Sequence, residues 1–492
     1  MYIISSLFSH LKRSSNETEA AIMLSTKKTR NFTEGPMFFK ILTFALPIML
    51  TGILQIMYNM ADNIVVGQWS GDPNALGAVG STSSLNNLVL NLVIGTSAGT
   101  GVIVAQCIGA RRDRDVSRAV HTALTFSLFI GIILGAIGFA ISRPVLAMIG
   151  TQEILLDNAV LYMRIICLGI PASSIYNFSS SILRSAGDSR TPLIILTATG
   201  IINVVLNLFF VITCGMSVDG VALATIISQY VSAVVVVIVL SKKKGEAYQF
   251  SFKKLCFDTV LLKRILRIGI PSGIQSSLFS ISNIVLTNGI NSFGDPNVIT
   301  AYTINNNIDG ITYTACNSFY QAALTFTGQN YGAMKYERIR KTLIFSLIQV
   351  AVVGILVSQI ELIFSEQLVS LYIASDAPNK TEVTAITLDM MQIMLNTYFL
   401  CGVMEVVVGV LRGLGYSIRP MIISLTGACV FRIVWRYVFF PLEAFNTPKG
   451  LLLSFPLSWI LTIIMQLCLF VFAWKKMKKE FASSNSEPTK TA

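Results

Sequence analysis

Residues 42–67 read LTFALPIMLTGILQIMYNMADNIVVG, an apolar stretch that is long enough to cross a bilayer as a helix. Near its far end stands one carboxylate, Asp62, and Tyr58 and Asn59 lie one helical turn earlier on the same face. An ionisable residue inside a membrane span is costly and usually functional. The stretch therefore predicts a membrane helix with a candidate site, the alternative being that Asp62 lies just beyond the span in headgroup water.

The composition places the whole chain in the membrane. Of its 492 residues, 53% are hydrophobic and 13% are charged, whereas a soluble domain has about 25% charged residues. The net charge of +12 does not indicate a nucleic-acid partner. The basic residues fall in short clusters between apolar runs, which is the pattern of orientation charge.

Twelve apolar runs are long enough to span, so we predict an all-α polytopic membrane protein with twelve transmembrane helices. Lys and Arg concentrate in loops 111–118, 242–267 and 335–341 and in the tail from 475, while the alternate loops hold few. Both termini are therefore expected in the cytoplasm and the protein in the plasma (cell inner) membrane. The runs lie near 38–66, 76–107, 119–141, 155–183, 191–213, 218–240, 259–291, 298–331, 342–363, 383–411, 418–441 and 450–474.

The second half of the chain repeats the first. Gln106-x-x-Gly109 at the end of the second run matches Gln329-x-x-Gly332 at the end of the eighth, and four further motifs recur at a spacing of 223 to 228 residues, beginning at Pro47, Asn59, Gly71 and Leu183. A repeat of six spans predicts two pseudo-symmetric six-helix bundles in the same orientation. We expect a disordered cytoplasmic N-terminus at 1–36, an N-lobe at 37–241, a basic linker at 242–258, a C-lobe at 259–475 and a cytoplasmic tail at 476–492.

Polar side chains gather at the depth of Asp62 in the first bundle. Asn203 and Asn207 are four residues apart on one face of the fifth span, and Thr225 lies at a similar depth in the sixth. One carboxylate among amide and hydroxyl oxygens suits either a small hard cation or a proton site. The alternative is a hydrogen-bond cluster that only holds the helices together.

The second bundle offers weaker candidates. Asp309 in the eighth span shares its expected depth with Arg432 and Arg436 in the eleventh, which favours a neutralised, structural pair. Glu405 in the tenth span has no cation at its own depth, so it is a second candidate for coupling or for binding a cationic substrate. Pro47 interrupts the hydrogen bonding of the first span and is either a hinge or a static bend.

Other chemistries find little support. Paired carboxylates on adjacent turns, HExxH, a nucleophile with a base and a phosphate loop are all absent from the sequence, so we expect no enzyme and no cofactor. The two histidines and the eight cysteines, which form no CxxC, indicate no metal site apart from a place for Na+ at Asp62.

These motifs together resemble the multidrug and toxic compound extrusion (MATE) family of prokaryotic type, over about residues 37–475. The resemblance rests on the span with Pro47 and Asp62, on both Gln-x-x-Gly-Ala motifs and on Leu-Arg-x-x-Gly-x-Ser-x-x-Pro at 183–192 and 411–420. It implies that Asp62 couples transport to a cation and that Asn203 belongs to that site. Asn207 stands where one branch has a second aspartate. Gln275 and Asn283 supply only neutral groups in the seventh span, where another branch has a glutamate.

The resemblance implies a secondary active antiporter that exports small amphipathic or cationic organic compounds, such as drugs and toxins. Inward flow of H+ or Na+ would drive that export by alternating access of the two lobes. Neither branch pattern fits well enough to name the ion. A flippase for a lipid-linked saccharide or another amphipathic lipid is the alternative, although such a protein should line its cavity with several basic residues. We expect the protein to work as a monomer.

Overall fold

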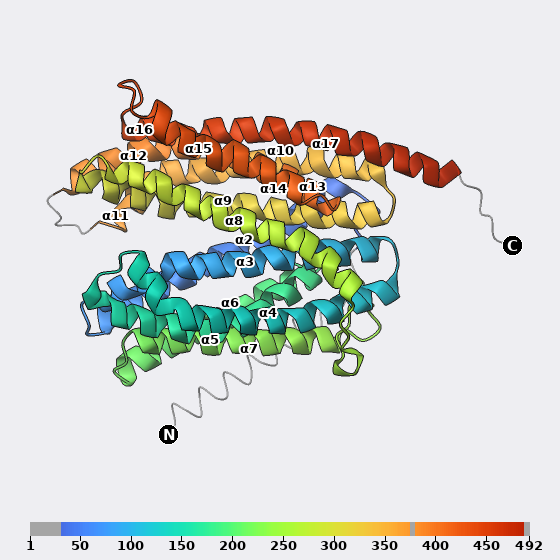
Figure 1. Cartoon of the computed structure of the whole chain (residues 1–492), viewed down its shortest axis with the longest axis horizontal. Helices are drawn as coiled ribbons and strands as arrows, with labels where there is room; N and C mark the ends of the chain where they lie inside the picture. The colour runs from blue at the N-terminus through green and yellow to red at the C-terminus, as the bar shows by residue number, and fades with distance from the viewer. Residues whose placement is uncertain (1–30, 374–378, 487–492) are drawn as a thin grey trace.

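The computed structural model describes residues 31–373 and 379–486, without the side chains of Ser84 and residues 480–486. The described residues fold almost entirely into helices and contain no strand. Long helices run side by side, with the first half of the chain (blue to green) on one side of the molecule and the second half (yellow to red) on the other (Figure 1).

The first half of the chain forms six long helical rods, the fifth of which ends in a π-helical turn, η1. A connection that contains the 3₁₀ turn η2 (Phe252–Lys254) then leads to the second half. The rods are α2 (Met37–Trp69), α3 (Ala75–Gly109), α4 (Asp113–Met148), α5 (Glu153–Ser185), α6 (Arg190–Leu208) with η1 (Phe209–Thr213), and α7 (Val218–Lys242).

The second half forms six more rods, three of which consist of consecutive shorter helices. Its elements are α8 (Thr259–Asn291), α9 (Pro296–Gly332), α10 (Tyr336–Ile363), the short α11 (Ser365–Ser370), α12 (Lys380–Thr397) with α13 (Phe399–Gly413), α14 (Ile418–Ser424) with η3 (Leu425–Val430), α15 (Phe431–Val434) and η4 (Trp435–Phe439), and α16 (Pro448–Leu452) with α17 (Ser454–Ser486).

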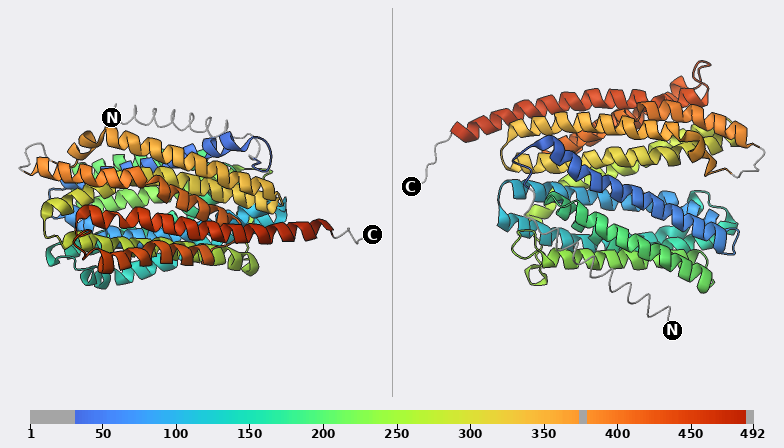
Figure 2. Two further views of the ribbon diagram at one scale, coloured as in Figure 1. Left: turned by 90° about the horizontal axis from the view of Figure 1, so that it is seen from above. Right: turned by 180° about the vertical axis from the view of Figure 1, so that it is seen from behind.

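Ten helical spans within the described residues are long and apolar enough to cross a membrane. The two remaining rods, α8 and α9, are among the longest but carry more polar side chains. Helix α8 crosses the front face of the molecule with Ile270, Ile281 and Ile284 exposed (Figure 1). Seen from behind, the second half of the chain again lies on one side and the first half on the other (Figure 2). The predicted all-α membrane fold with twelve spans in two halves is therefore confirmed.

The turns 109–113, 242–259 and 332–336 lie at one end of the bundle, which we call the basic end because it holds the basic loops. The two halves repeat each other in backbone detail there and at the opposite end. Arg111 and Met334 have φ of 55° and 57°. The Asp72 carboxylate accepts a hydrogen bond from the Asn74 amide at 2.9 Å, as Asp295 does from Asn297 at 2.8 Å. The repeat predicted from sequence is confirmed.

Helix α2 packs on both halves of the molecule. Near the basic end, Ile41 and Phe44 belong to an apolar cluster with Phe326 and other residues of the second half. Near the opposite end, Val65 and Val66 pack with α3 and α5 of the first half. The first helix therefore crosses from one half to the other.

Helix α8 makes the reciprocal crossing. Ile265 and Ile268, near the basic end, pack with residues of α3 and α4 in the first half. Leu286 and Ile290, near the opposite end, pack with α9 and α12 in the second half. Because both helices contribute to both halves, the predicted lobe boundaries at 241 and 259 stay a prediction.

Each crossing helix contains a proline between its two packing regions, Pro47 in α2 and Pro271 in α8. Proline has no amide hydrogen and so leaves one carbonyl of the preceding turn without its helical partner. The carbonyl left without its helical partner is that of Thr43, whereas the Thr51 hydroxyl donates to the carbonyl of Pro47 itself at 2.7 Å. The hinge role predicted for Pro47 stays a prediction.

We predicted that residues 1–36 are disordered, and residues 1–30 of this segment lie outside the described residues. Residues 31–36, however, pack on α9 and α10, and Phe32 is 1% exposed. This part of the prediction is wrong because the segment carries an aromatic anchor that we did not recognise. At the other terminus α17 continues to Ser486.

Candidate functional site

Four of the six predicted residues around Asp62 meet between α2, α6 and α7. The Asn207 amide donates a hydrogen bond to one Asp62 oxygen. The Thr225 hydroxyl lies 3.5 Å from the other Asp62 oxygen, and the Asn203 amide lies 3.4 Å from that hydroxyl. Asn203 and Asn207 are 6% and 0% exposed. The i, i+4 spacing thus places both asparagines on one face, as predicted, where Asn207 bonds Asp62 directly and Asn203 reaches it through Thr225.

The hydrogen bonding of this site is incomplete. Thr225 has only one hydroxyl proton to donate. Its hydroxyl oxygen lies 2.9 Å from the Val221 carbonyl oxygen and 3.5 Å from Asp62, so the closer partner is Val221. The side-chain oxygen of Asn207 is buried and accepts no hydrogen bond from any described residue. In the described part of the chain, no lysine or arginine forms an ion pair with Asp62. The site therefore offers oxygen atoms and one negative charge to a small cation or a proton.

Tyr58 and Asn59 differ in their relation to this site. The Tyr58 hydroxyl donates to the Thr197 carbonyl on α6 at 3.2 Å. Its ring fills the space where a side chain on Gly200 would lie, so the glycine allows α2 to approach α6 closely. Asn59 is exposed and makes no hydrogen bond among the described residues. We did not anticipate Tyr162 on α5, which is buried within electrostatic range of Asp62.

The predicted pairing of Asp309 with Arg432 or Arg436 is wrong. The Arg432 guanidinium donates to Ser458 at 3.1 Å and to Asn283 at 3.4 Å, and it lies over the Phe455 ring. Arg436 donates to Ser292 at 3.2 Å. Depth along the bundle was right for both arginines, but they face α8 and α17, whereas Asp309 lies near Glu361 of α10.

Two of the other candidates in the second half, Gln275 and Glu405, lie near Arg412. Gln275 of α8 accepts a hydrogen bond from Arg412 at 2.9 Å, and the Tyr320 hydroxyl accepts another at 2.6 Å. Glu405 is buried on α13 and feels the positive charge of Arg412. Glu405 therefore has a cation nearby, contrary to our expectation, while Asn283 is exposed apart from its contact with Arg432.

The two halves are joined at the basic end by a pair of equivalent glutamines. The Gln106 amide of α3 donates to the Gly413 carbonyl of α13 at 2.9 Å, and the Gln329 amide of α9 donates to the Ser185 carbonyl of α5 at 2.8 Å. All four groups are buried. We call these two bonds the glutamine seal, because each connects the end of one half to the other half.

Two glycines permit this close approach. A Cβ atom on Gly109 would collide with the Gln329 carbonyl, and one on Gly332 would collide with the Gln106 carbonyl. The sequence analysis used these Gln-x-x-Gly motifs only as markers of the repeat. Their recurrence at the end of one helix in each half was nevertheless the signal of a symmetric contact.

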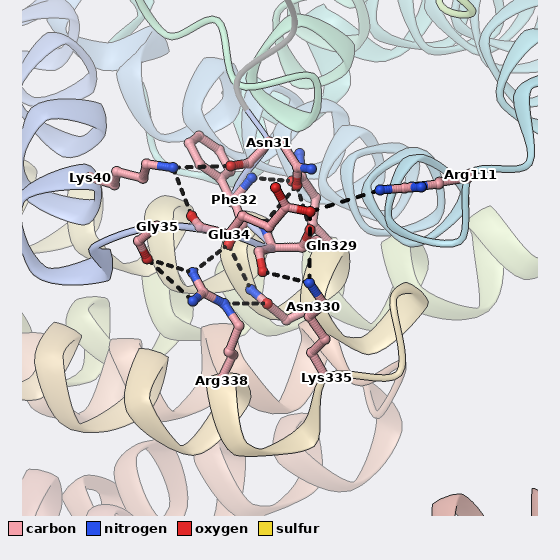
Figure 3. A network of polar contacts seen from close by, with 11 residues as sticks. Asn31, Phe32, Glu34, Gly35, Lys40, Arg111, Gln329, Asn330, Lys335 and Arg338 are labelled. Carbon is pink, nitrogen blue, oxygen red and sulfur yellow. Dashed lines mark hydrogen bonds and ion pairs between the residues drawn. The ribbon is translucent and has the colours of Figure 1, made fainter. Parts of the chain in front are cut away.

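Residues 31–35, which we call the strap, lie against the glutamine seal (Figure 3). The Phe32 amide donates to the Gln329 side-chain oxygen at 3.0 Å, and the Phe32 ring stacks on Phe326 with centroids 3.9 Å apart. Arg338 donates to the carbonyls of Phe32 and Gly35 at 3.1 and 3.2 Å. The strap thus completes the hydrogen bonding of one glutamine.

Glu34 on the strap lies between the two halves. Its carboxylate is 3.8 Å from Arg111, which follows α3, and 4.0 Å from Lys335, which precedes α10. These charges are exposed, so each pair stabilises the contact little. In the conformation described, the basic end is therefore closed by buried hydrogen bonds, close glycine contacts and the strap.

Comparisons with known proteins agree with this architecture. A family model described as MatE matches residues 47–209 and 271–438, one segment in each half. The chain is 26% identical over 449 residues to the probable multidrug resistance protein YoeA of Bacillus subtilis, covering 88% of this chain and 93% of that protein. It is 27% identical over 414 residues to the probable multidrug resistance protein NorM of Thermotoga maritima, covering 81% and 85%.

A solved structure with 21% sequence identity shares the fold, with a TM-score of 0.85 over 92% of this chain and 100% of that chain. That structure is described as the outward-facing conformation of a multidrug resistance MATE family transporter of the MOP superfamily.

Proposed function

The chain belongs to the MatE family of multidrug efflux transporters, and we propose that it is a secondary antiporter that exports small amphipathic or cationic organic compounds in exchange for inward H+ or Na+. The observation that carries this proposal is the Asp62 carboxylate. It lies between three helices among neutral oxygen and amide groups, and no described cation pairs with it. A membrane-embedded carboxylate of this kind is an ion site by its chemistry.

We assign the basic end to the cytoplasm, since Lys and Arg are retained on that side of the membrane. Both termini then lie in the cytoplasm, and the membrane is the plasma membrane. With this assignment, the glutamine seal closes the transporter towards the cytoplasm. The conformation described is the one in which an ion from outside reaches Asp62.

Helix α2 supplies a route from the ion to the rest of the molecule. Asp62 binds Asn207 of the first half, while Phe44 of the same helix packs on the second half. Uptake of H+ or Na+ removes or redirects the charged hydrogen bond, and thus changes how firmly one segment of α2 is held. The bond and the packing of α2 are coupled because they belong to one continuous helix.

Typical free energies indicate how far the ion at Asp62 can shift the conformational equilibrium. A hydrogen bond to a charged group contributes about 1.5–3 kcal/mol. Moving a two-state equilibrium from 1:99 to 99:1 takes about 5.5 kcal/mol. Loss of this one bond therefore biases the equilibrium without completing the switch, and the exported compound, which favours the opposite opening, drives the return.

The test is efflux of a cationic dye from proteoliposomes under an imposed H+ gradient and, separately, an imposed Na+ gradient. We expect one gradient to drive efflux in the wild type and Asp62→Asn to abolish it. Asp389→Asn is the matched control, because Asp389 is a surface carboxylate that pairs with Lys449 at 2.9 Å. Gradient-driven efflux that persists in Asp62→Asn would refute the proposed role of this residue.

The same preparation separates the second candidate activity. If neither gradient drives efflux of any cationic dye, while the protein moves a lipid-linked saccharide between leaflets, the flippase replaces the antiporter. The monomer is tested in parallel by the mass of the detergent-solubilised protein.

A further inference from the structure

The second half of the chain contains a buried pair of carboxylates that the proposed coupling site does not use. Asp309 on α9 is 7% exposed and Glu361 on α10 is 4% exposed. The Thr312 hydroxyl donates to Glu361 at 2.8 Å and lies 3.5 Å from the Ser358 hydroxyl. The sequence analysis missed Glu361, because it lies two residues before the end of an apolar run, where a carboxylate is normally interfacial.

No cation neutralises this pair within residues 31–373 and 379–486. Neither carboxylate forms an ion pair. The two buried arginines of the second half donate elsewhere, Arg412 to Gln275 and Arg432 to Ser458. Two carboxylates that are close enough to repel each other and are buried without a counter-charge make an expensive arrangement. A ligand with positive charge removes that cost.

A separate observation also indicates a ligand. Asn305 is fully buried, and neither its amide nitrogen nor its carbonyl oxygen has a hydrogen-bond partner. It lies four residues before Asp309 and seven before Thr312, so all three share one face of α9. The hydrogen bond between Thr312 and Glu361 turns this face towards α10. The second oxygen of Glu361 is also buried without a partner. Buried polar atoms normally have partners.

The internal repeat shows that this group is not part of the common framework. The positions 223 residues earlier hold Asn86, Val89 and Gly138 in place of Asp309, Thr312 and Glu361. The first half packs its corresponding helices without any carboxylate there. Helix packing in this fold therefore does not require the acidic pair.

We propose that Asp309 and Glu361, together with Asn305 and Thr312, form a second cation site, which binds a dehydrated Na+ ion. The carboxylate, amide and hydroxyl oxygens are the ligands of a hard cation. Ca²⁺ takes about 6–8 oxygen ligands, and Mg²⁺ keeps several waters, which this small and buried group does not provide. Its burial also excludes an organic cation. The site goes beyond the proposed function, which places one coupling ion at Asp62.

The experiment measures equilibrium binding of ²²Na+ to the purified full-length protein in detergent. Asp62→Asn serves as the background, so that any ion at the first site does not contribute. We expect this variant to retain Na+ binding and the double variant with Glu361→Gln to lose about 100-fold or more in affinity. Thr312→Val, which preserves shape, should lose about tenfold, as the loss of one supporting ligand does.

The control is Glu366→Gln in the same background, because Glu366 is an exposed carboxylate five residues further along. It should bind Na+ like the background. Each variant is checked for a single elution peak and for its Tm, and Thr312→Val keeps the proposal testable if Glu361→Gln does not fold. Absence of Na+ binding in Asp62→Asn, or unchanged binding after Glu361→Gln, overturns the proposal. Proton uptake without Na+ binding also overturns it, since the pair then shares a proton.

These outcomes are independent of dye efflux. If the second site exists, Asp62→Asn binds Na+ even when the protein transports no dye. If the second site does not exist, Asp62→Asn binds no Na+ even when the wild type is an active antiporter.

Discussion

Removing the glutamine seal should shift the molecule towards the conformation that is open at the basic end. Gln106→Leu deletes one bond across the two halves, to the Gly413 carbonyl. Gln329→Leu deletes the equivalent bond and also the one that Gln329 accepts from the strap at Phe32. The strap packs on α9 and α10, so this second bond lies within the second half and does not distinguish the two conformations. Each bond contributes about 1 kcal/mol. The closed form should therefore lose about 1 kcal/mol in either single variant, roughly 5-fold in population ratio, and about 2 kcal/mol, roughly 30-fold, in the double variant.

The measurement is a pair of spin labels at Arg114 and Arg340, which are exposed at the basic end on α4 and α10. The labels are introduced into a variant without the eight native cysteines. Distance distributions should gain a longer component, similar in the two single variants and larger in the double variant. Gln359→Leu is the control, since Gln359 bonds to Asn396 within the second half. Unchanged distributions in the seal variants, or a double variant that opens no further than the single ones, would refute the reasoning.

Three further changes test other contacts. Gly200→Val should separate α2 from α6 by collision with the Tyr58 ring and lower ion-driven dye efflux more than Tyr58→Phe does; equal activity of both variants would contradict this. Phe32→Ala removes a fully buried ring and should lower the stability of the docked strap by about 3–5 kcal/mol. Proteolysis of the strap should then become faster, and an unchanged rate would show that the ring does not hold the strap in place. Gly332→Ala should push against the Gln106 carbonyl and lower the Tm, whereas Gly310→Ala, inside α9 with open space around it, should leave the Tm unchanged or raise it slightly.

The sequence was sufficient for the fold and for the centre of the first site. Span length and alternating basic loops depend on physical requirements of the bilayer, so they can be read directly. Asn207 met Asp62 directly and Asn203 met it through Thr225, because the helical repeat fixes which side chains share a face and the direction of each span fixes depth. The same reasoning failed for Asn59. It lies three positions before Asp62 in α2, but at the exposed edge of the helix face that carries Asp62.

The second half was harder to predict for a physical reason. Depth places Asp309 and Arg432 at one level, but the rotation of each helix about its axis decides which neighbour a side chain meets. That rotation follows from packing with several helices at once, which no single span records. Glu361 was missed because a carboxylate near the end of an apolar run has no feature that separates a buried group from an interfacial one.

The strap was missed for another reason. Residues 31–35 have no periodicity, and their anchor is a single aromatic ring that finds its partner on a distant helix. Recognition of such a contact needs the partner surface, which only the folded molecule provides.

The crossing of α2 has a consequence for biosynthesis. Phe44 leaves the ribosome about 280 residues before Phe326, the ring against which it packs. At 5–20 residues per second this interval is roughly 15 to 60 s. During that time one segment of α2 has only lipid or the insertion machinery as a neighbour, although its other segment already has native partners. The two repeats are thus not independent folding units, and a nascent chain that stops after α7 holds its first helix half assembled.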